Sequence, residues 1–197
     1  EYQLLVDYKS MEKYPSGSMN QADTLESRYN SKSQEREIYL ERARDCSELT
    51  IPTLIPESGS TYSEEFQTTY QGIGARGVNN LSSKLLLSLL PPNAPFFRLS
   101  VDTFAVKEIE EDENLRTQID SGLVQIEKAV MDDVEMSNDR VAVFEALKHL
   151  IVGGNVLLFV SKEGLRVFPL SHYVIQRDPM GNVLEIITKE SIHYSAL

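Results

Sequence analysis

Cysteine and histidine are scarce in this chain, and their scarcity excludes several kinds of site. Cys46 is the single cysteine among 197 residues, so neither an intrachain disulfide framework nor a cysteine-based zinc cluster can form. The three histidines, His149, His172 and His193, stand in no H-E-x-x-H pattern and at no other metal-ligand spacing. The sequence therefore predicts no metal site, no bound cofactor and no catalytic residues.

Positive charge is also in short supply, and long apolar runs are missing. The formal net charge is −11, which disfavours tight binding to a phosphate backbone because such binding requires clustered lysine and arginine. Neither a secretory signal nor a membrane-spanning stretch is found, so a soluble, intracellular protein is expected. The chain begins at Glu1 and a new helical pattern starts near Ser195, so we expect a piece of a longer polypeptide.

Glycine is concentrated at the start of residues 70–92, which read YQGIGARGVNNLSSKLLLSLLPP. Three glycines match the G-x-G-x-x-G pattern of dinucleotide-binding loops: Gly72, Gly74 and Gly77. That fingerprint requires a hydrophobic strand before the first glycine and an acidic residue at the end of a second strand about 20 residues later. Residues 63–70 are polar and residues 91–95 read PPNAP, so neither condition is met. The glycines are instead expected to allow a tight, close-packed turn into a helix.

A leucine-rich helix is expected over residues 78–90. Four apolar residues recur at helical spacing and three more widen the apolar face: Val78, Leu81, Leu85 and Leu89, then Leu86, Leu87 and Leu90. Such a helix is expected in a core or between subunits, enclosed on all sides, with Leu85 and Leu89 in the enclosed region. Arg76, inside the glycine turn, is expected to pair with an acid or with backbone carbonyls.

The segments before and after this helix have weaker signals. Thr24 is expected to cap a single helix that runs to about Glu48, with Cys46 as a small buried residue on it. Residues 96–101 read FFRLSV, which is typical of a strand.

The most regular helix is expected at residues 111–136. Six apolar residues form one stripe: Leu115, Ile119, Leu123, Ile126, Val130 and Val134. Asp132, Asp133 and Glu135 lie near its C-terminal end, where the helix dipole disfavours anions, and a basic partner or solvent would relieve that cost. Adjacent acids on a helix point to different sides, which disfavours a paired catalytic role.

Beyond residue 139 the pattern changes from helical to alternating. Asn138 or Asp139 is expected to cap a helix that ends at Gly153 and Gly154. Two hairpins are expected next, residues 155–160 with 165–169 and residues 173–177 with 183–189.

Helices followed by antiparallel hairpins indicate an α+β fold. The expected organisation has four parts. Residues 1–22 are expected to be a poorly structured extension, because KYPSGS at 13–18 breaks regular structure. A helical part at 23–154 and a hairpin part at 155–190 follow, and a further element is expected to start at 191–197, where the chain is cut.

Several short blocks resemble segments of the portal proteins, or head-to-tail connectors, of short-tailed (podovirus-type) bacteriophages. The longest is YQGIGARGVNNLSSKL at residues 70–85. The others follow in family order: RDC at 44–46 with TIP at 50–52, FFRL at 96–99, FEALK at 144–148 with VGGNVLL at 152–158, and YVIQRD at 173–178 with GNVL at 181–184. Together they cover about residues 25–197, whereas residues 1–22 show no such likeness.

The resemblance implies a structural subunit of a dodecameric ring at one capsid vertex, in the virion and, during assembly, in the cytoplasm of the host bacterium. Such a ring is the conduit for genome packaging and ejection and joins head to tail. The implied partners are other copies of the subunit, the capsid protein, the tail adaptor, the terminase packaging motor, and double-stranded DNA that passes without sequence-specific binding. No enzymatic activity is implied, because ATP hydrolysis would belong to the motor. The piece resembles the N-terminal part of the wing, without stem or clip.

Six residues of the glycine-rich segment are candidates for structural or subunit packing: Arg76, Gly77, Asn79, Asn80, Leu85 and Leu89. Two alternatives stay open. An enzyme that binds a nucleotide with the Gly72–Gly77 loop would need a phosphate-binding lysine, and Lys84 comes too late for a G-x-x-x-x-G-K loop. A generic helical scaffold or adaptor would be favoured by a monomer in solution.

Overall fold

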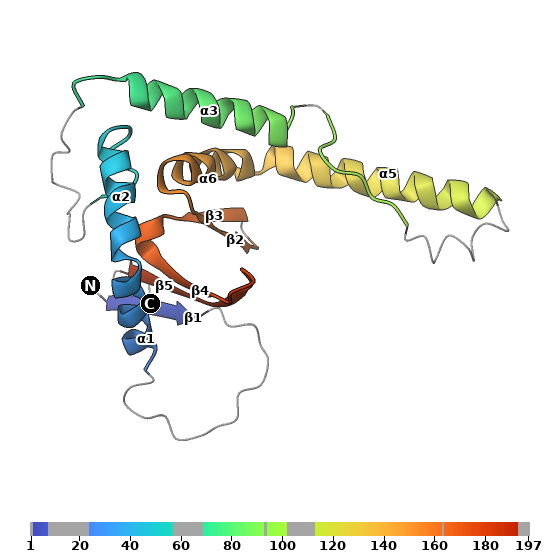
Figure 1. Cartoon of the computed structure of the whole chain (residues 1–197). Coiled ribbons are helices and arrows are strands. Elements are labelled where there is room, and N and C mark those ends of the chain that lie inside the picture. The colour runs from blue at the N-terminus through green and yellow to red at the C-terminus, as the bar shows by residue number, and fades with distance from the viewer. Residues whose placement is uncertain are drawn as a thin grey trace.

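The structure is a computed structural model that describes residues 2–7, 24–56, 69–92, 94–101, 113–162 and 164–192. The helices of these residues are α1 (Leu25–Glu35), α2 (Glu37–Glu48), α3 (Ile73–Leu89), α5 (Glu113–Met136) and α6 (Asp139–Gly153), with a 3-10 turn η2 (Leu170–His172). The strands are β1 (Tyr2–Asp7), β2 (Leu157–Ser161), β3 (Gly164–Phe168), β4 (Tyr173–Arg177) and β5 (Val183–Ile192). Five helices and two antiparallel hairpins confirm the expected α+β class (Figure 1).

Both predicted hairpins are present, in separate sheets. Among the described strands, β2 and β3 pair only with each other, with Leu157 opposite Phe168. β4 pairs with β5, with Val174 opposite Ile187. The turn of this second hairpin requires a glycine, because Gly181 has a φ of 91°.

The expectation that residues 1–22 are poorly structured is wrong for their first part. β1 pairs antiparallel with the outer edge of β5, so the second sheet has the order β1-β5-β4. β4 pairs with one edge of β5, and β1 pairs with the opposite edge over residues 187–192. β5 is far from β1 in the sequence, so the helix- and strand-breaking residues near β1 do not reveal that the two strands pair. β5 also continues through Ile192, past the expected boundary at 190, and residues 193–197 lie outside the described residues.

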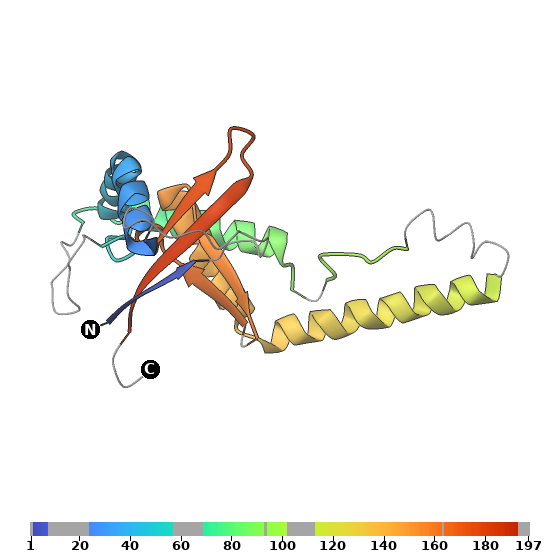
Figure 2. The ribbon, with the colours of Figure 1, turned by 90° about the horizontal axis from the view of Figure 1, so that it is seen from below.

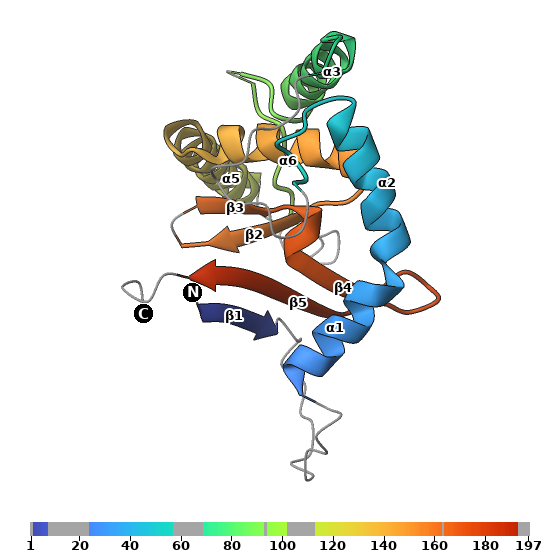
Figure 3. The same cartoon turned by 90° about the vertical axis from the view of Figure 1, so that its left-hand side faces the viewer.

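One face of the β4–β5 sheet is covered by α1 (Figure 3). Tyr29 packs with Val174 and Ile187, and Leu25 lies at the margin of this cluster. Thr24 caps the helix as predicted, because its hydroxyl oxygen accepts a hydrogen bond from the backbone N–H of Ser27 at 3.3 Å.

The single helix expected from Thr24 to Glu48 is two helices, broken at Arg36. The Arg36 guanidinium donates hydrogen bonds to the carbonyl oxygens of Leu170, Ser171 and Tyr173. These carbonyls belong to η2 and the start of β4, so the break lets one side chain tie α1 and α2 to the connection between the two sheets.

A second core lies between α2, α3 and α6. Its buried members are Leu40, Ala43, Ile55, Val78 and Val152. Ser47, not Cys46, is the buried residue at the end of α2, because its hydroxyl donates to the Ile51 carbonyl and accepts from the Ile55 N–H. Cys46 is exposed, so the expectation that it is buried is wrong.

The helix α3 begins earlier than predicted and is less enclosed. Its N-terminal turns contain Gly74, where a Cβ would stand 2.6 Å from the Leu49 carbonyl oxygen, so this glycine permits the close approach of α3 to the end of α2. Val78 and Ser82 are buried, whereas Leu81, Leu87 and Leu89 are exposed. Among the described residues, α6 and α2 cover one side of α3, so these residues do not enclose the helix on all sides, and its enclosure between subunits stays a prediction.

The helix α5 projects from the rest of the molecule as an arm (Figures 1 and 2). The described segment 94–101 contacts it, because the Leu99 N–H donates to Glu127 Oε1 at 2.6 Å. That segment is irregular, so the strand predicted at 96–101 is wrong. At the junction of the arm with α6, Asn138 occupies the N-cap position without a side-chain cap bond, and Gly154 ends α6 in the left-handed conformation as predicted.

Candidate functional site

The six candidate residues of the glycine-rich segment lie along α3. Arg76, Gly77, Asn79 and Asn80 are exposed, Leu85 is half-buried, and Leu89 is 53% exposed. They are spread along the helix, and α3 presents most of them outward. Their assignment to subunit packing remains a prediction.

Arg76 does not behave as expected within this chain. Its side chain is exposed and makes no hydrogen bond or ion pair across the described ranges of the chain. A Cβ added to the neighbouring Gly77 would meet nothing within 4 Å. The pairing of Arg76 with an acid or a carbonyl therefore stays a prediction that only an assembled form can test.

The glycine pattern is explained by packing and not by phosphate binding. Gly72 is the N-cap of α3, while Gly74 and Gly77 lie inside the helix. A phosphate loop instead wraps free backbone N–H groups around the ligand before the helix begins. The side of Gly74 that would carry a Cβ is occupied by Leu49 and Thr50. Nothing in this geometry favours the nucleotide-binding alternative.

The described residues also lack two other kinds of site. Among those the structure describes, no group of three or more His, Cys, Asp or Glu side chains could hold a metal ion. In this same part of the chain, no helix combines the length and the apolar composition needed to cross a membrane.

The described residues form an open groove of about 620 Å³ between α1 and β4. Its basic lining residues are Arg28, Lys32, Arg36 and Arg177, and its acidic lining residue is Glu35. Ser27, Ser31 and Gln176 add polar groups, while Tyr39 and Ile175 supply apolar surface. The groove is therefore basic in a chain whose net charge is −11.

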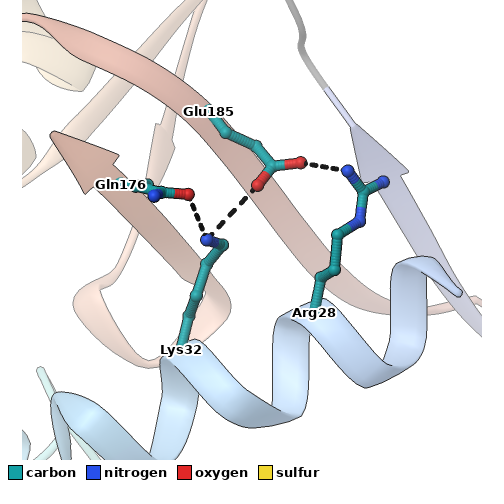
Figure 4. A network of polar contacts seen from close by, with 4 residues as sticks. All are labelled: Arg28, Lys32, Gln176 and Glu185. Atoms are coloured by element: carbon teal, nitrogen blue, oxygen red, sulfur yellow. Dashed lines mark hydrogen bonds and ion pairs between the residues drawn. The ribbon is translucent and has the colours of Figure 1, made fainter. Parts of the chain in front are cut away.

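A buried carboxylate anchors one wall of this groove (Figure 4). Glu185, on β5, lies 2.7 Å from the Arg28 guanidinium and 3.4 Å from the Lys32 ammonium. The Lys32 ammonium also donates to the amide oxygen of Gln176 on β4. Glu185 is 6% exposed, so its charge requires these partners, and the network fixes α1 against the sheet.

Arg36 lines the groove and contacts η2. Burial lowers the pKa of its guanidinium, and the nearby Tyr29, Tyr173 and Glu37 oppose that shift. Burial also raises the pKa of the Tyr173 hydroxyl to about 12, so this phenol is neutral near pH 7. Glu37 lies 3.1 Å from Arg44, with which it pairs. The positive charge of Arg36 is therefore held by carbonyl dipoles rather than by a carboxylate of its own.

Local sequence patterns do not predict this groove. One signal was available: Arg28 and Lys32 are four residues apart on a predicted helix and so share a face. Their partner Glu185 is 157 residues from Arg28, and no local pattern links the two.

Residues 22–196 match the family model described as bacteriophage head to tail connecting protein. The portal protein of Escherichia phage T7 is 39% identical over 181 residues, covering 89% of this chain and 34% of the relative. The portal protein of Enterobacteria phage T3 is 38% identical over 180 residues, with the same shares of 89% and 34%.

A third relative, the portal protein of Enterobacteria phage SP6, is 35% identical over 156 residues, covering 79% of this chain and 30% of the relative. The chain thus spans about a third of the length of the curated relatives it matches. A match over almost the whole chain confirms the resemblance found in its sequence blocks. This chain belongs to the bacteriophage head to tail connecting protein family.

Proposed function

We propose that this chain is the N-terminal wing part of a structural portal subunit that joins the phage head to the tail. The subunit stands in a dodecameric ring at one capsid vertex, and it resides in the host cytoplasm during assembly. The ring contacts the capsid protein, the tail adaptor and the terminase packaging motor, and it has no enzymatic activity of its own. Double-stranded DNA passes through it during packaging and ejection.

The observation that carries this proposal is the family match over residues 22–196, together with portal relatives that are 39% and 38% identical. The charge of −11 is compatible with it, because a conduit that bound phosphates tightly would hold back a sliding duplex. The exposed apolar residues of α3 and α5 also suit a subunit that packs against other surfaces.

Electron microscopy of the full-length protein that carries this chain tests the proposal. We expect closed rings with a central channel, and mass photometry should give one dominant species at about twelve subunits. A protein that stays monomeric across a wide concentration range would contradict the ring and favour a generic scaffold. Labelled ATP in the same preparation should not be bound or hydrolysed.

A further inference from the structure

The groove between α1 and β4 has positive charge that the described residues leave without carboxylate partners. Among the described residues, Arg36 donates to three carbonyl oxygens and lies beside the Tyr29 hydroxyl, and Arg177 donates to the Gly181 carbonyl at 3.0 Å. Lys32 must share the single carboxylate of Glu185 with Arg28. Such an excess of cations in a partly enclosed groove attracts a carboxylate-rich ligand.

The last turn of α5 has the opposite character. Asp132, Asp133 and Glu135 are all exposed, and none forms an ion pair with another residue in the described part of the chain. The turn contains no basic residue, and the negative end of the helix dipole adds to the unfavourable charge. Met136, beside these acids, is 82% exposed. This acidic turn, with an exposed apolar side chain at the junction with α6, thus has no ion-pair partner among the described residues.

We propose that the groove between α1 and β4 binds the last turn of α5 from a second copy of this protein. The acids of that turn lie against Lys32 and Arg177, and Met136 lies against Tyr39 and Ile175. Charge and apolar surface are matched at both places. The inference rests on the ring proposed above and names one contact between its neighbours.

The placement of the two surfaces makes this contact intermolecular. The last turn of α5 is at the junction with α6 and not at the projecting tip, and in Figures 1 and 2 this junction lies away from α1, so a chain does not fill its own groove. Two different surfaces that bind each other join copies head to tail, and such contacts close into a ring when the rotation between neighbours allows it.

Charge reversal in the full-length protein tests the contact. Arg177→Glu and Asp133→Lys, each alone, should raise the protein concentration needed for half-maximal ring formation by about tenfold or more, because like charges then meet. The double variant Arg177→Glu/Asp133→Lys should return most of the way to the unmodified protein. Arg42→Glu on α2 and Asp120→Lys on α5 are matched controls, since they make the same charge changes at exposed positions outside the contact.

The Asp133→Lys variant distinguishes a loss of docking from a loss of folding, because it should change helix stability and assembly in opposite directions. Asp133→Lys places a cation at the negative end of the α5 dipole and so should stabilise the helix while it weakens assembly. Rings that form from the unmodified protein and equally well from both single variants would overturn this contact and leave the ring intact. Unmodified protein that forms no rings would instead contradict the proposed function.

Crosslinking tests proximity without relying on ring stability. The pair Arg177→Cys and Asp133→Cys, in a Cys46→Ser background, is treated with a short bis-maleimide. We expect a ladder of covalent multimers on a denaturing gel, and no ladder beyond background when Arg42→Cys replaces Arg177→Cys. Equal ladders from the two pairs, or none from either, would overturn the contact.

Discussion

The body of the molecule and the α5 arm carry similar apolar patterns but differ in what covers them. In the body, Ile187 is 0% exposed, enclosed by Tyr29 and Val174. On the arm, Ile126 and Val130 recur at regular helical spacing, yet they are 52% and 40% exposed. Periodicity therefore determines which face of an element is apolar, whereas the surface that covers this face must come from another part of the chain or another molecule.

The largest expected difference comes from one substitution made in both regions. Ile187→Ala removes a fully buried side chain and should lower the free energy of unfolding by about 2–5 kcal/mol through lost burial and the cavity left behind. Ile126→Ala on the arm should cost less than about 1 kcal/mol, because the side chain is half in water and alanine favours helix. Urea denaturation followed by circular dichroism measures both. Equal losses of unfolding free energy for the two variants would mean that another surface buries Ile126 in solution.

Charged residues give the next largest contrast. Glu185→Gln leaves the partly buried Arg28 and Lys32 without their carboxylate and should cost about 1–3 kcal/mol, less than for a fully buried pair because both cations still reach solvent. Glu135→Gln on the arm removes an exposed anion from a helix C-terminus and should be neutral or stabilise by up to about 0.5 kcal/mol. The same denaturation experiment distinguishes the two signs. A loss at Glu135 equal to that at Glu185 would argue against this contrast.

Most of the secondary structure could be predicted from local patterns, while most of the burial could not. The hairpins, α5 and α6 follow from spacing and turn residues that lie within a few positions of each other. Cys46 and Ser47 are neighbours of similar size, and Ser47 is the buried one because its hydroxyl has partners at Ile51 and Ile55. Arg36 reads as part of a solvated helix face, but its partners lie more than 130 residues away.

The six candidate residues illustrate the same limit at the site. Helix α3 was correctly expected, but a leucine-rich sequence does not say which neighbours are present, and Leu89 is left exposed. The groove between α1 and β4 was not predicted, because its two walls are far apart in the sequence, as the 144 positions between Lys32 and Gln176 show. Long-range pairing, as at Arg28 with Glu185, leaves no local signal in the sequence.

Replacing one glycine in the body and one in the α5 arm should give smaller changes in stability, of opposite sign. Gly74→Ala should destabilise by about 1–2 kcal/mol, because its Cβ would stand 2.6 Å from the Leu49 carbonyl oxygen and α3 must shift away. Gly122→Ala, in the middle of α5, should stabilise by about 0.5–1 kcal/mol, because a Cβ there meets nothing within 4 Å and alanine favours helix. Thermal unfolding of the two variants should shift in opposite directions. A stabilised Gly74→Ala would show that α3 does not require this close approach.

The smallest expected effect is a dependence on pH that belongs to the body alone. Burial lowers the pKa of both His149 and His172 below the ordinary value of 6.5. The unfolded chain therefore binds protons first as the pH falls, so the stability that these histidines contribute is present above about pH 6.5 and is lost below it. The helix α5 contains no histidine, so the helicity of the arm should not follow the same curve. As the pH is lowered from about 8 to about 5.5, the urea midpoint of the unmodified protein should fall, and that of His149→Leu should fall less. If the two proteins show the same dependence of the midpoint on pH, the loss of stability belongs to other groups.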